Sequence, residues 1–543
     1  MFGWQGKLLR IDLSNKQSHV EEIGEGLSDT LGGRGLALKI YTQEIDAKIN
    51  PLSPENKIVL ATGPLTGTGA SSASVCAVVT KSAFNETVIS AQIKLHFGAE
   101  LKAAGYDALV IEGKADQPVL IAIKDEEVLF LPADFLLDKP TDEAESLFRL
   151  SFNDPWVARE TRILHIGMAG QKQSPLASLI TDGLSVTNSV GIGAVFGSKN
   201  VIGIAVRGTK DILVQEKDIF LKSITQNISK MSQKLDKFFK FSSYTPFEYY
   251  YQHNVLACNY FIEPFANQVT LDQIIASWER QRGCFSCPIA CLRMKNGRFL
   301  PEIDAFMAIG PLCGIFDVSV ISEIYLICTK LGLDAVETGF LLSCAMALKE
   351  KGLLKEDEIP NFGDKENILK LLPLIAEKKI KILEKGAFKL CESLNKPDFF
   401  LGIKGRGMVF DVRNNHFLSL FYATSTQGAV YFNGFSLLRE IHEDIPQEVK
   451  SIQDKIAISE SLGVCPYLFV TLPLDEVLSL FKTVTGICLN EEELLKKAEA
   501  VYQVERNFNE KVGFKKEDDM LPKRFLFPEF ESMLNTYHQL RGW

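Results

Sequence analysis

The sequence predicts an α+β protein, with a β-rich N-terminal region followed by two mainly α-helical regions. Residues 7–13 alternate polar and apolar side chains over most of their length, which is the period of a half-buried strand. Residues 118–131 hold two β-rich runs around the polar segment 124–127, and this pattern predicts a hairpin. Residues 201–206 predict another apolar strand, and beyond Gly208 the apolar positions return at helical spacing.

Two changes of character along the chain predict domain boundaries. The first is the change from β to helical spacing near residue 208, and the second is the polar stretch 395–398. At roughly 150 residues a domain, a chain of 543 residues has room for three such units. We therefore expect domains at 1–208, 209–400 and 401–543. In the two later domains we expect helices over residues 321–331, 335–349, 368–385 and 447–461.

The composition is that of a globular protein that does not bind nucleic acid. Hydrophobic residues make up 46% of the chain, enough for a large core. The formal net charge of −9 disfavours broad contact with nucleic acid phosphates. The N-terminal residues lack the pattern of a signal peptide, and no apolar run reaches the roughly 18 residues of a membrane span. We expect a cytoplasmic protein with no membrane segment, in which thiols stay reduced.

Three of the 11 cysteines stand in one short run, Cys284, Cys287 and Cys291. Their C-x2-C-x3-C spacing gathers three thiolates, and iron–sulfur clusters bind cysteine thiolates, usually four. Arg282 and Arg293 flank the run and offset the negative charge of such a cluster. Zinc is the rival metal, but its sites use two separated pairs of ligands, and no nearby histidine or second C-x2-C accompanies this run. Inert thiols are a third interpretation.

Spacing alone leaves the fourth ligand open. Cys465 has Gly463 before it and Pro466 directly after it, so it is predicted to lie on a turn. Cys344 falls inside an amphipathic helix, where a small buried hydrophobe is the better interpretation. The other candidates are Cys313, Cys328, Cys391 and Cys488.

Glycines and helix ends add two further patterns. Glycines gather at 32–35, 63–69 and 191–193, where they serve either ordinary turns or close backbone approach to a ligand. Residues 331–334 and 462–465 each follow an amphipathic helix with Leu-Gly and an apolar residue. This similarity indicates a duplicated helix-end loop.

Over nearly its whole length the chain resembles the tungsten-containing aldehyde ferredoxin oxidoreductase family. The cysteine run and the helix-end loops belong to the resemblance. So do these segments: 56–57, 63–68, 79–82, 97–102, 104–108, 112–115, 193–195, 197–200, 521–525 and 540–543.

The resemblance implies a fold, a chemistry and a set of partners. A β-sheet domain would form the base under a cofactor, and two helical domains would cover it. The cofactor would be a tungsten (or molybdenum) ion held by two pterins, beside a [4Fe–4S] cluster. The chemistry would be oxidation of an aldehyde to a carboxylic acid, with electrons passed to ferredoxin or to another redox protein or subunit. A homo- or hetero-oligomer is compatible with this function.

The resemblance also implies roles for particular residues. It assigns the cluster to Cys284, Cys287, Cys291 and Cys465. An active-site glutamate of the family corresponds to Asp304. The resemblance assigns one pterin to each helix-end loop, the first through Gly332, Leu333 and Asp334 and the second through Glu460, Gly463 and Val464.

The chain departs from the family pattern chiefly where the pterins bind. Residues 73–75 replace Gly-Gly-Arg, residues 91–95 replace Ala-Asn-Ser-Gly-Gly, and residues 187–191 replace Ala-Gly-Arg-Gly-Gly. Arginines that pair with phosphates and glycines that admit a ligand are lost in these exchanges. The aspartates that begin the two loops become Thr329 and Glu460.

Three functions remain open at this point. The first is an aldehyde-oxidising enzyme with a divergent metallopterin site. The second is a pterin-free electron-transfer or structural subunit that retains the [4Fe–4S] cluster beside an active partner. The third is a zinc-stabilised interaction protein. The near-complete resemblance favours the first, whereas intact cysteines beside altered phosphate-binding residues favour the second.

Overall fold

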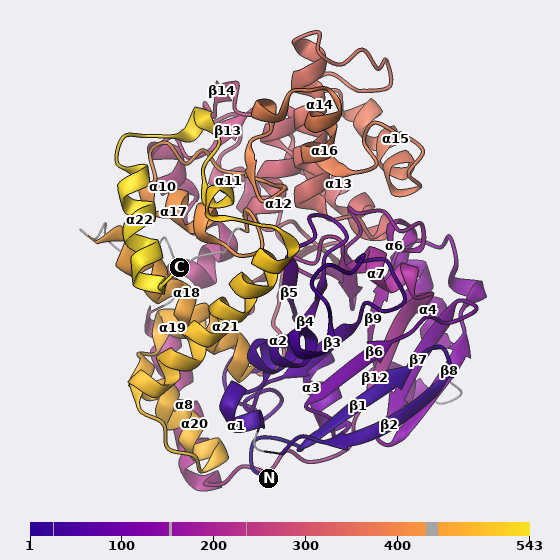
Figure 1. The fold of residues 1–543 in the computed structure, drawn as a ribbon, viewed down its shortest axis with the longest axis vertical. Coiled ribbons are helices and arrows are strands. Elements are labelled where there is room, and N and C mark those ends of the chain that lie inside the picture. The colour runs from indigo at the N-terminus through magenta and orange to yellow at the C-terminus, as the bar shows by residue number, and fades with distance from the viewer. Residues whose placement is uncertain (25, 151–154, 235, 431–443) are drawn as a thin grey trace.

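The described residues of the N-terminal region form two six-stranded mixed sheets that pack face to face (Figure 1). The computed structural model describes the whole chain except residues 25, 151–154, 235 and 431–443. The first sheet has the strand order β2-β1-β6-β3-β4-β5, and the second has the order β11-β10-β9-β12-β7-β8. The predicted α+β class is confirmed.

Within these two sheets only the pairs β1·β6 and β7·β12 run parallel. The strands of the first sheet are β1 Lys7–Asp12, β2 Gln17–Glu22, β3 Ile58–Thr62, β4 Cys76–Lys81, β5 Val88–Ile93 and β6 Ala108–Glu112. Those of the second are β7 Val119–Lys124, β8 Glu127–Pro132, β9 Arg162–Ile166, β10 Leu179–Thr181, β11 Leu184–Ser185 and β12 Val201–Arg207. The predicted strands at 7–13 and 201–206 and the predicted hairpin are therefore confirmed as β1, β12 and β7–β8.

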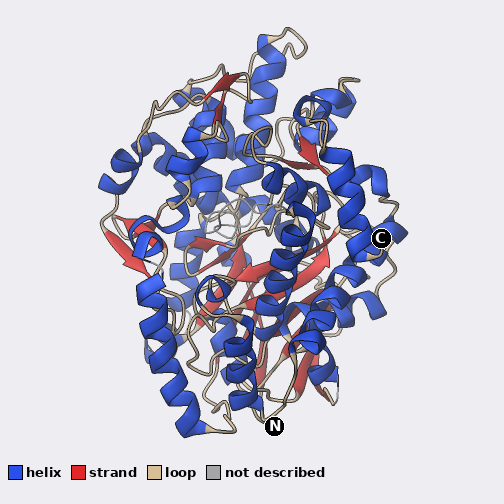
Figure 2. Cartoon of the chain, turned by 90° about the vertical axis from the view of Figure 1, so that its left-hand side faces the viewer, coloured by secondary structure: helices blue, strands red, loops and turns tan. Residues whose placement is uncertain are grey.

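The rest of the chain is mainly helical, as Figure 2 shows in the half of the molecule away from the N-terminus. The helices within the first 208 residues are α1 Gly26–Thr30, α2 Gly33–Glu44, α3 Phe97–Ala103, α4 Thr141–Leu150, α5 Pro155–Glu160, α6 Met168–Gln171 and α7 Ile192–Ser198. Those that follow, as far as residue 400, are α8 Lys217–Lys234, α9 Asp236–Phe241, α10 Phe247–Gln252, α11 Leu271–Ala276, α12 Ile303–Ile309, α13 Val318–Leu331, α14 Ala335–Glu350, α15 Lys365–Ala376 and α16 Gly386–Ser393. The last are α17 His416–Thr424, α18 Ile445–Leu462, α19 Leu468–Thr471, α20 Leu474–Thr485, α21 Glu491–Val512 and α22 Phe530–Arg541.

Short strands interrupt the helical part. They are β13 Ala257–Cys258, β14 Glu263–Pro264, β15 Arg280–Arg282, β16 Leu292–Lys295, β17 Arg298–Phe299, β18 Gly402–Ile403 and β19 Arg406–Gly407. The antiparallel strands β15, β16 and β17 form a small sheet, and the cysteine run lies between its first two strands.

The central strands β3 and β4 of the first sheet are buried on both faces, whereas the edge strand β2 is exposed. Leu60 and Ile89 on one face belong to a single core with Ile121 of the second sheet. Val59 and Val79 on the other face lie in a core with α2 and the C-terminal helices α18 and α21. This burial explains why β3 and β4 are buried along their whole length and show no alternation of polar and apolar residues.

Three of the four predicted helices match α13, α14 and α18 closely. The fourth, predicted over 368–385, was wrong in its second half because α15 ends at Ala376. Lys378 adopts a left-handed φ of 58°, and the Lys379 amide donates back to the Leu374 carbonyl at 2.8 Å. This is the geometry of a helix terminus, and the apolar spacing of the sequence does not reveal it.

Among the described residues, no single helix is long and apolar enough to cross a membrane. The segments Ile303–Cys313 and Val318–Leu331 reach that length and apolar content only as a pair, and they are bent by 113° at their break.

Candidate metal centre and its surroundings

Cys284, Cys287 and Cys291 lie on the loop that joins β15 to β16. The loop curls back on itself because Ser286 and Ala290 adopt positive φ angles of 51° and 46°. The Cys287 amide donates to the Cys284 carbonyl at 3.1 Å, and all three thiols are half-buried. The short spacing of the run is thus folded into a compact turn.

Cys465 is held beside this loop by Ser72. It follows α18, which ends at Gly463 with a φ of 80°. The Cys465 amide donates to the Ser72 carbonyl at 3.0 Å, and the Ser72 amide donates to the Ser286 carbonyl at 3.2 Å. The Ser72 hydroxyl lies 3.4 Å from the Sγ atom of Cys287. One residue of the N-terminal region therefore joins the fourth cysteine to the loop.

The thiols are close enough to influence one another electrostatically. Burial raises the pKa of Cys465 to about 12, with further contributions from Cys287 and Cys284. Burial and then the Cys284 and Cys287 charges raise the pKa of Cys291, and burial followed by the Cys287 charge raises that of Cys284. Lys94 opposes all three shifts. A bound metal replaces the protons, because the thiolate is the ligand form.

The donor set fits a [4Fe–4S] cluster better than a single zinc ion. A cluster takes one thiolate at each iron, so its cysteines stand farther apart than the ligands of one ion. Within the part of the chain that the structure describes, no three His, Cys, Asp or Glu side chains are placed to hold a single metal ion. Four cysteines supply one thiolate for each iron corner of such a cluster.

The remaining candidates for the fourth cysteine lie elsewhere in the fold. Cys488 is exposed. The buried thiols of Cys344 and Cys391 lie 3.6 Å from each other. Of these candidates, Cys313, Cys328, Cys344 and Cys391 are buried in the helical core.

The first helix-end loop packs onto the second sheet region. Gly332 ends α13 with a φ of 71°, and its carbonyl accepts from the Ser178 amide at 2.9 Å. Leu333 is fully buried and forms an isolated β-bridge with Ala177. Asp334 caps α14 by accepting from the Glu337 amide at 3.0 Å, and burial raises its pKa.

The second helix-end loop carries Glu460 at the centre of a buried network. Arg34 lies 2.8 Å from Glu460 and 2.7 Å from Glu505, and all three side chains are at most 8% exposed. Gln92 also donates to Glu460, and the Thr426 hydroxyl donates to Glu505 at 2.5 Å. Burial raises the pKa of Glu460, and the Arg34 charge opposes that shift. The negative charges of Glu460 and Glu505 are therefore balanced by Arg34 and by hydrogen bonds from within the protein.

Gly463 and two N-terminal glycines let the backbones around this loop approach closely. A Cβ atom on Gly33 would lie 2.0 Å from the Glu460 carbonyl oxygen, and one on Gly63 would lie 2.0 Å from the Leu462 carbonyl carbon. A Cβ atom on Gly463 would lie 1.9 Å from the Thr66 Oγ1 atom. Val464 beside it is fully buried. At these positions the glycines serve contact between two parts of the chain.

Asp304 lines a cavity of about 50 Å³ together with Lys94, Glu302 and Asp334. Burial and the nearby Glu302 charge raise the pKa of Asp304 to about 7. Arg406 also reaches this cavity and lies 3.1 Å from Glu337. Because one water needs roughly 10–15 Å³ of accessible cavity volume, the cavity has room for a few waters.

The space around the two helix-end loops does not fit two pterins. The cavity beside Asp304 and a second one beside Arg34 and Glu460 measure about 50 Å³ each between described residues. Pockets for drug-sized ligands span roughly 300–1,000 Å³. Gln92, whose side chain donates to Glu460, also forms an isolated β-bridge with Thr187. Both of these cavities between described residues are smaller than such a ligand needs.

Two residues near the cysteines belong to no motif of the sequence, Ser72 and Lys94. Lys94 carries a recognisable signal, because it is a charged residue directly after a mainly apolar, buried strand. Ser72 carries no such signal. Its contacts reach loops that are remote in the sequence.

Comparison with known proteins gives a consistent result along the chain. Residues 8–208 match the model of the aldehyde ferredoxin oxidoreductase N-terminal domain, and residues 220–543 match that of domains 2 and 3. The tungsten-containing aldehyde ferredoxin oxidoreductases of Pyrococcus furiosus and Thermococcus kodakarensis are each 32% identical to this chain. Both comparisons cover 100% of this chain and 97% of the relative.

Two more distant matches extend the comparison. The WOR-like subunit of an aliphatic sulfonate oxidoreductase from Pyrococcus furiosus is 25% identical, covering 91% of this chain and 84% of its own. The solved active site complex BamBC of benzoyl coenzyme A reductase contains a chain with the same fold, at a TM-score of 0.88 and 21% identity. That match covers 100% of this chain and 95% of the other. With matching family models along most of its length and relatives above 30% identity, the chain belongs to the aldehyde ferredoxin oxidoreductase family.

Proposed function

We propose that this protein is an oxidoreductase subunit that carries electrons through a [4Fe–4S] cluster and holds no metallopterin. The observation that supports this proposal is the pairing of Glu460 with Arg34 and Gln92, which fills the loop that the family uses for a pterin. The four cysteines that the resemblance assigns to the cluster are all present in this chain. The residues expected to bind the pterins are altered, whereas the cysteines expected to bind the cluster are present. This contrast favours electron transfer without the aldehyde chemistry.

In this proposal, Cys284, Cys287, Cys291 and Cys465 hold the cluster. The bound cluster supplies one-electron transfer. Ser72 keeps Cys465 against the cysteine loop through its carbonyl, amide and hydroxyl groups. We also propose three domains, at 1–208, 209–400 and 401–543, with the cluster between loops of all three.

The electron partner is proposed to be a redox protein such as ferredoxin, or a catalytic subunit. Ser286, between two of the cysteines, is exposed, so the cysteine loop reaches the surface where a partner docks. Two relatives support a subunit role. One is named as a subunit of an aliphatic sulfonate oxidoreductase, and the other structure is a complex of benzoyl coenzyme A reductase.

A second candidate function is oxidation of an aldehyde to a carboxylic acid at a tungsten or molybdenum pterin. The 32% identity with tungsten-containing aldehyde ferredoxin oxidoreductases over the whole chain favours it. In that case Asp304, whose raised pKa of about 7 lets it hold or release a proton near neutrality, would be the acid or base at the site. The pterins would then bind at Gly332, Leu333, Asp334, Glu460, Gly463 and Val464.

Metal and phosphorus analysis of anaerobically purified protein tests both functions. About four iron atoms per chain, without tungsten, molybdenum or pterin phosphate, is the result expected for the electron-transfer subunit. The same iron with one tungsten or molybdenum and pterin phosphate would establish the enzyme instead. A colourless protein that contains zinc and no iron would overturn both.

A further inference from the structure

Lys94 is the charged side chain that faces the cysteine centre from the first sheet. It stands one residue beyond β5, and its neighbour Leu95 accepts a hydrogen bond from the Phe285 amide at 3.0 Å. Leu95 also belongs to a small apolar cluster against which Cys284 and Cys291 pack. The backbone that carries Lys94 is therefore fixed directly to the cysteine loop.

The ammonium group of Lys94 interacts electrostatically with three of the four cysteines, namely Cys284, Cys291 and Cys465. Its side chain is only 18% exposed, so solvent screens this charge weakly. Glu302 lies 3.4 Å from the ammonium group and has a side-chain exposure of 19%. The cysteine centre thus faces a positive group that is partly balanced by one carboxylate.

Arg293 is another cation that interacts with a cysteine of the loop, Cys291. Its guanidinium group donates to the Ala290 and Phe239 carbonyls at 2.8 and 2.6 Å and lies over the Trp278 ring. These contacts give Arg293 a part in shaping the loop. Among the described residues, the Lys94 side chain makes one hydrogen bond, to Glu302, so its charge can be altered with less effect on the fold.

We propose that Lys94 sets the reduction potential of the cluster, and that Glu302 moderates this effect. The inference rests on the proposed function, because it requires that the four cysteines hold a cluster. Reduction adds one negative charge to a cluster, and a nearby positive charge stabilises the reduced form more than the oxidised form. Lys94 raises the reduction potential, and Glu302 lowers it by offsetting part of the Lys94 charge.

A potentiometric titration of the iron-loaded full chain, followed by electron paramagnetic resonance, tests the proposal. Lys94→Met should make the cluster about tenfold harder to reduce, which corresponds to a fall of about 59 mV for one electron. Lys94→Arg keeps the positive charge, so its equilibrium constant for reduction of the cluster should lie within about threefold of the wild-type value. Glu302→Gln should shift the potential upward, opposite to Lys94→Met. Lys355→Met, which removes an exposed lysine on the loop after α14, is the matched control and should change nothing.

The possible results distinguish a failure of this inference from a failure of the proposed function. A wild-type protein without iron overturns both. A wild type that contains the cluster, together with a Lys94→Met protein of equal iron content and equal potential, overturns the role of Lys94 alone. If Lys94→Met fails to retain iron, the Glu302→Gln protein provides the test instead. A cluster potential in Glu302→Gln that is not higher than the wild-type value contradicts the proposal.

Discussion

The hydroxyl of Ser72 lies 3.4 Å from the Sγ atom of Cys287, while the carbonyl of the same serine accepts from the Cys465 amide at 3.0 Å. Ser72 itself has a positive φ of 62°. This serine brings together a loop of the first helical region and a turn of the second. The cysteine centre is consequently assembled from three remote parts of the chain, and its integrity depends on their packing.

Replacing Cys465 by serine should remove the cluster or convert it to a form with less iron. The hydroxyl of serine is a poorer ligand for iron than a thiolate, and the three remaining cysteines would leave one iron corner without its usual ligand. Iron content and the visible spectrum of anaerobically prepared protein measure the effect. The exposed Cys488 provides the control, since Cys488→Ser should keep the iron of the wild type. Equal iron in the Cys465→Ser protein would show that another residue is the fourth ligand.

Replacing Arg34 by methionine should destabilise the protein strongly. Arg34 pairs with Glu460 and with Glu505, whose side chain is fully buried, and its removal leaves two buried carboxylates without their cation. Breaking a buried ion pair from one side costs about 3–5 kcal/mol. Unfolding in urea, followed by circular dichroism, measures the change in the free energy of unfolding.

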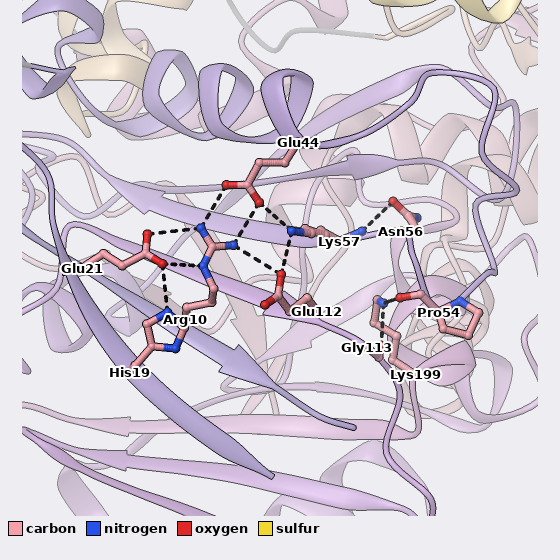
Figure 3. A network of polar contacts seen from close by, with 10 residues as sticks. All are labelled: Arg10, His19, Glu21, Glu44, Pro54, Asn56, Lys57, Glu112, Gly113 and Lys199. Carbon is pink, nitrogen blue, oxygen red and sulfur yellow. Dashed lines mark hydrogen bonds and ion pairs between the residues drawn. The ribbon is translucent and has the colours of Figure 1, made fainter. Parts of the chain in front are cut away.

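The matched control for Arg34 is Arg10, which also pairs with several carboxylates. Figure 3 shows Arg10 between Glu21, Glu44 and Glu112, with N–O distances of 2.8, 2.9 and 3.4 Å. Its carboxylate partners are 25–41% exposed, so water replaces the lost contacts. Arg10→Met should cost about 1 kcal/mol or less. Equal losses in the two variants would contradict the central place of the Arg34 network.

Some of this architecture was predictable because the signal is local. The three-cysteine loop was predictable from the short spacing of Cys284, Cys287 and Cys291. The strands β1 and β12 were predictable from the polar and apolar pattern within each strand. Cys465 required the family resemblance, because nothing in the spacing separates it from Cys313 or Cys488.

The remaining features depend on contacts between distant segments. Arg34 meets Glu505 only after α2 and α21 pack together, so no pattern in either helix reveals the pair. The end of α15 depends on the left-handed conformation of Lys378, a residue type that gives no such signal. The altered residues 91–95 indicated a changed region, but the pairing of Glu460 with Arg34 and Gln92 was not predictable from the sequence.

Replacing Asp304 by asparagine should stabilise the protein more at pH 8 than at pH 5.5. Burial and Glu302 raise the pKa of Asp304 to about 7, well above the usual value near 4. A carboxyl with a raised pKa in the folded state contributes its full stability below the unfolded pKa and loses it as the pH rises through the folded pKa. The neutral amide avoids this loss, so the benefit of the substitution should grow by about 1–2 kcal/mol between the two pH values. Urea unfolding at both pH values measures it, with the exposed Asp116→Asn as control. A benefit that is independent of pH would contradict the raised pKa.

Replacing Gly463 by alanine should displace Cys465 and lower the iron content. Gly463 has a φ of 80°, a conformation that costs an alanine about 1 kcal/mol, and its added Cβ would lie 1.9 Å from the Thr66 Oγ1 atom. Gly297 has a similar φ of 72° with no atom within 4 Å of an added Cβ, so Gly297→Ala carries the backbone strain without the collision. We expect Gly297→Ala to lose about 1 kcal/mol of stability and to keep its iron. Gly463→Ala should lose more stability, because the loop must move away from Thr66, and the amide of Cys465 then loses its bond to Ser72. Iron content measured together with urea unfolding tests this, and equal stability and equal iron in the two variants would show that the close approach at Gly463 does not hold the fourth cysteine in place.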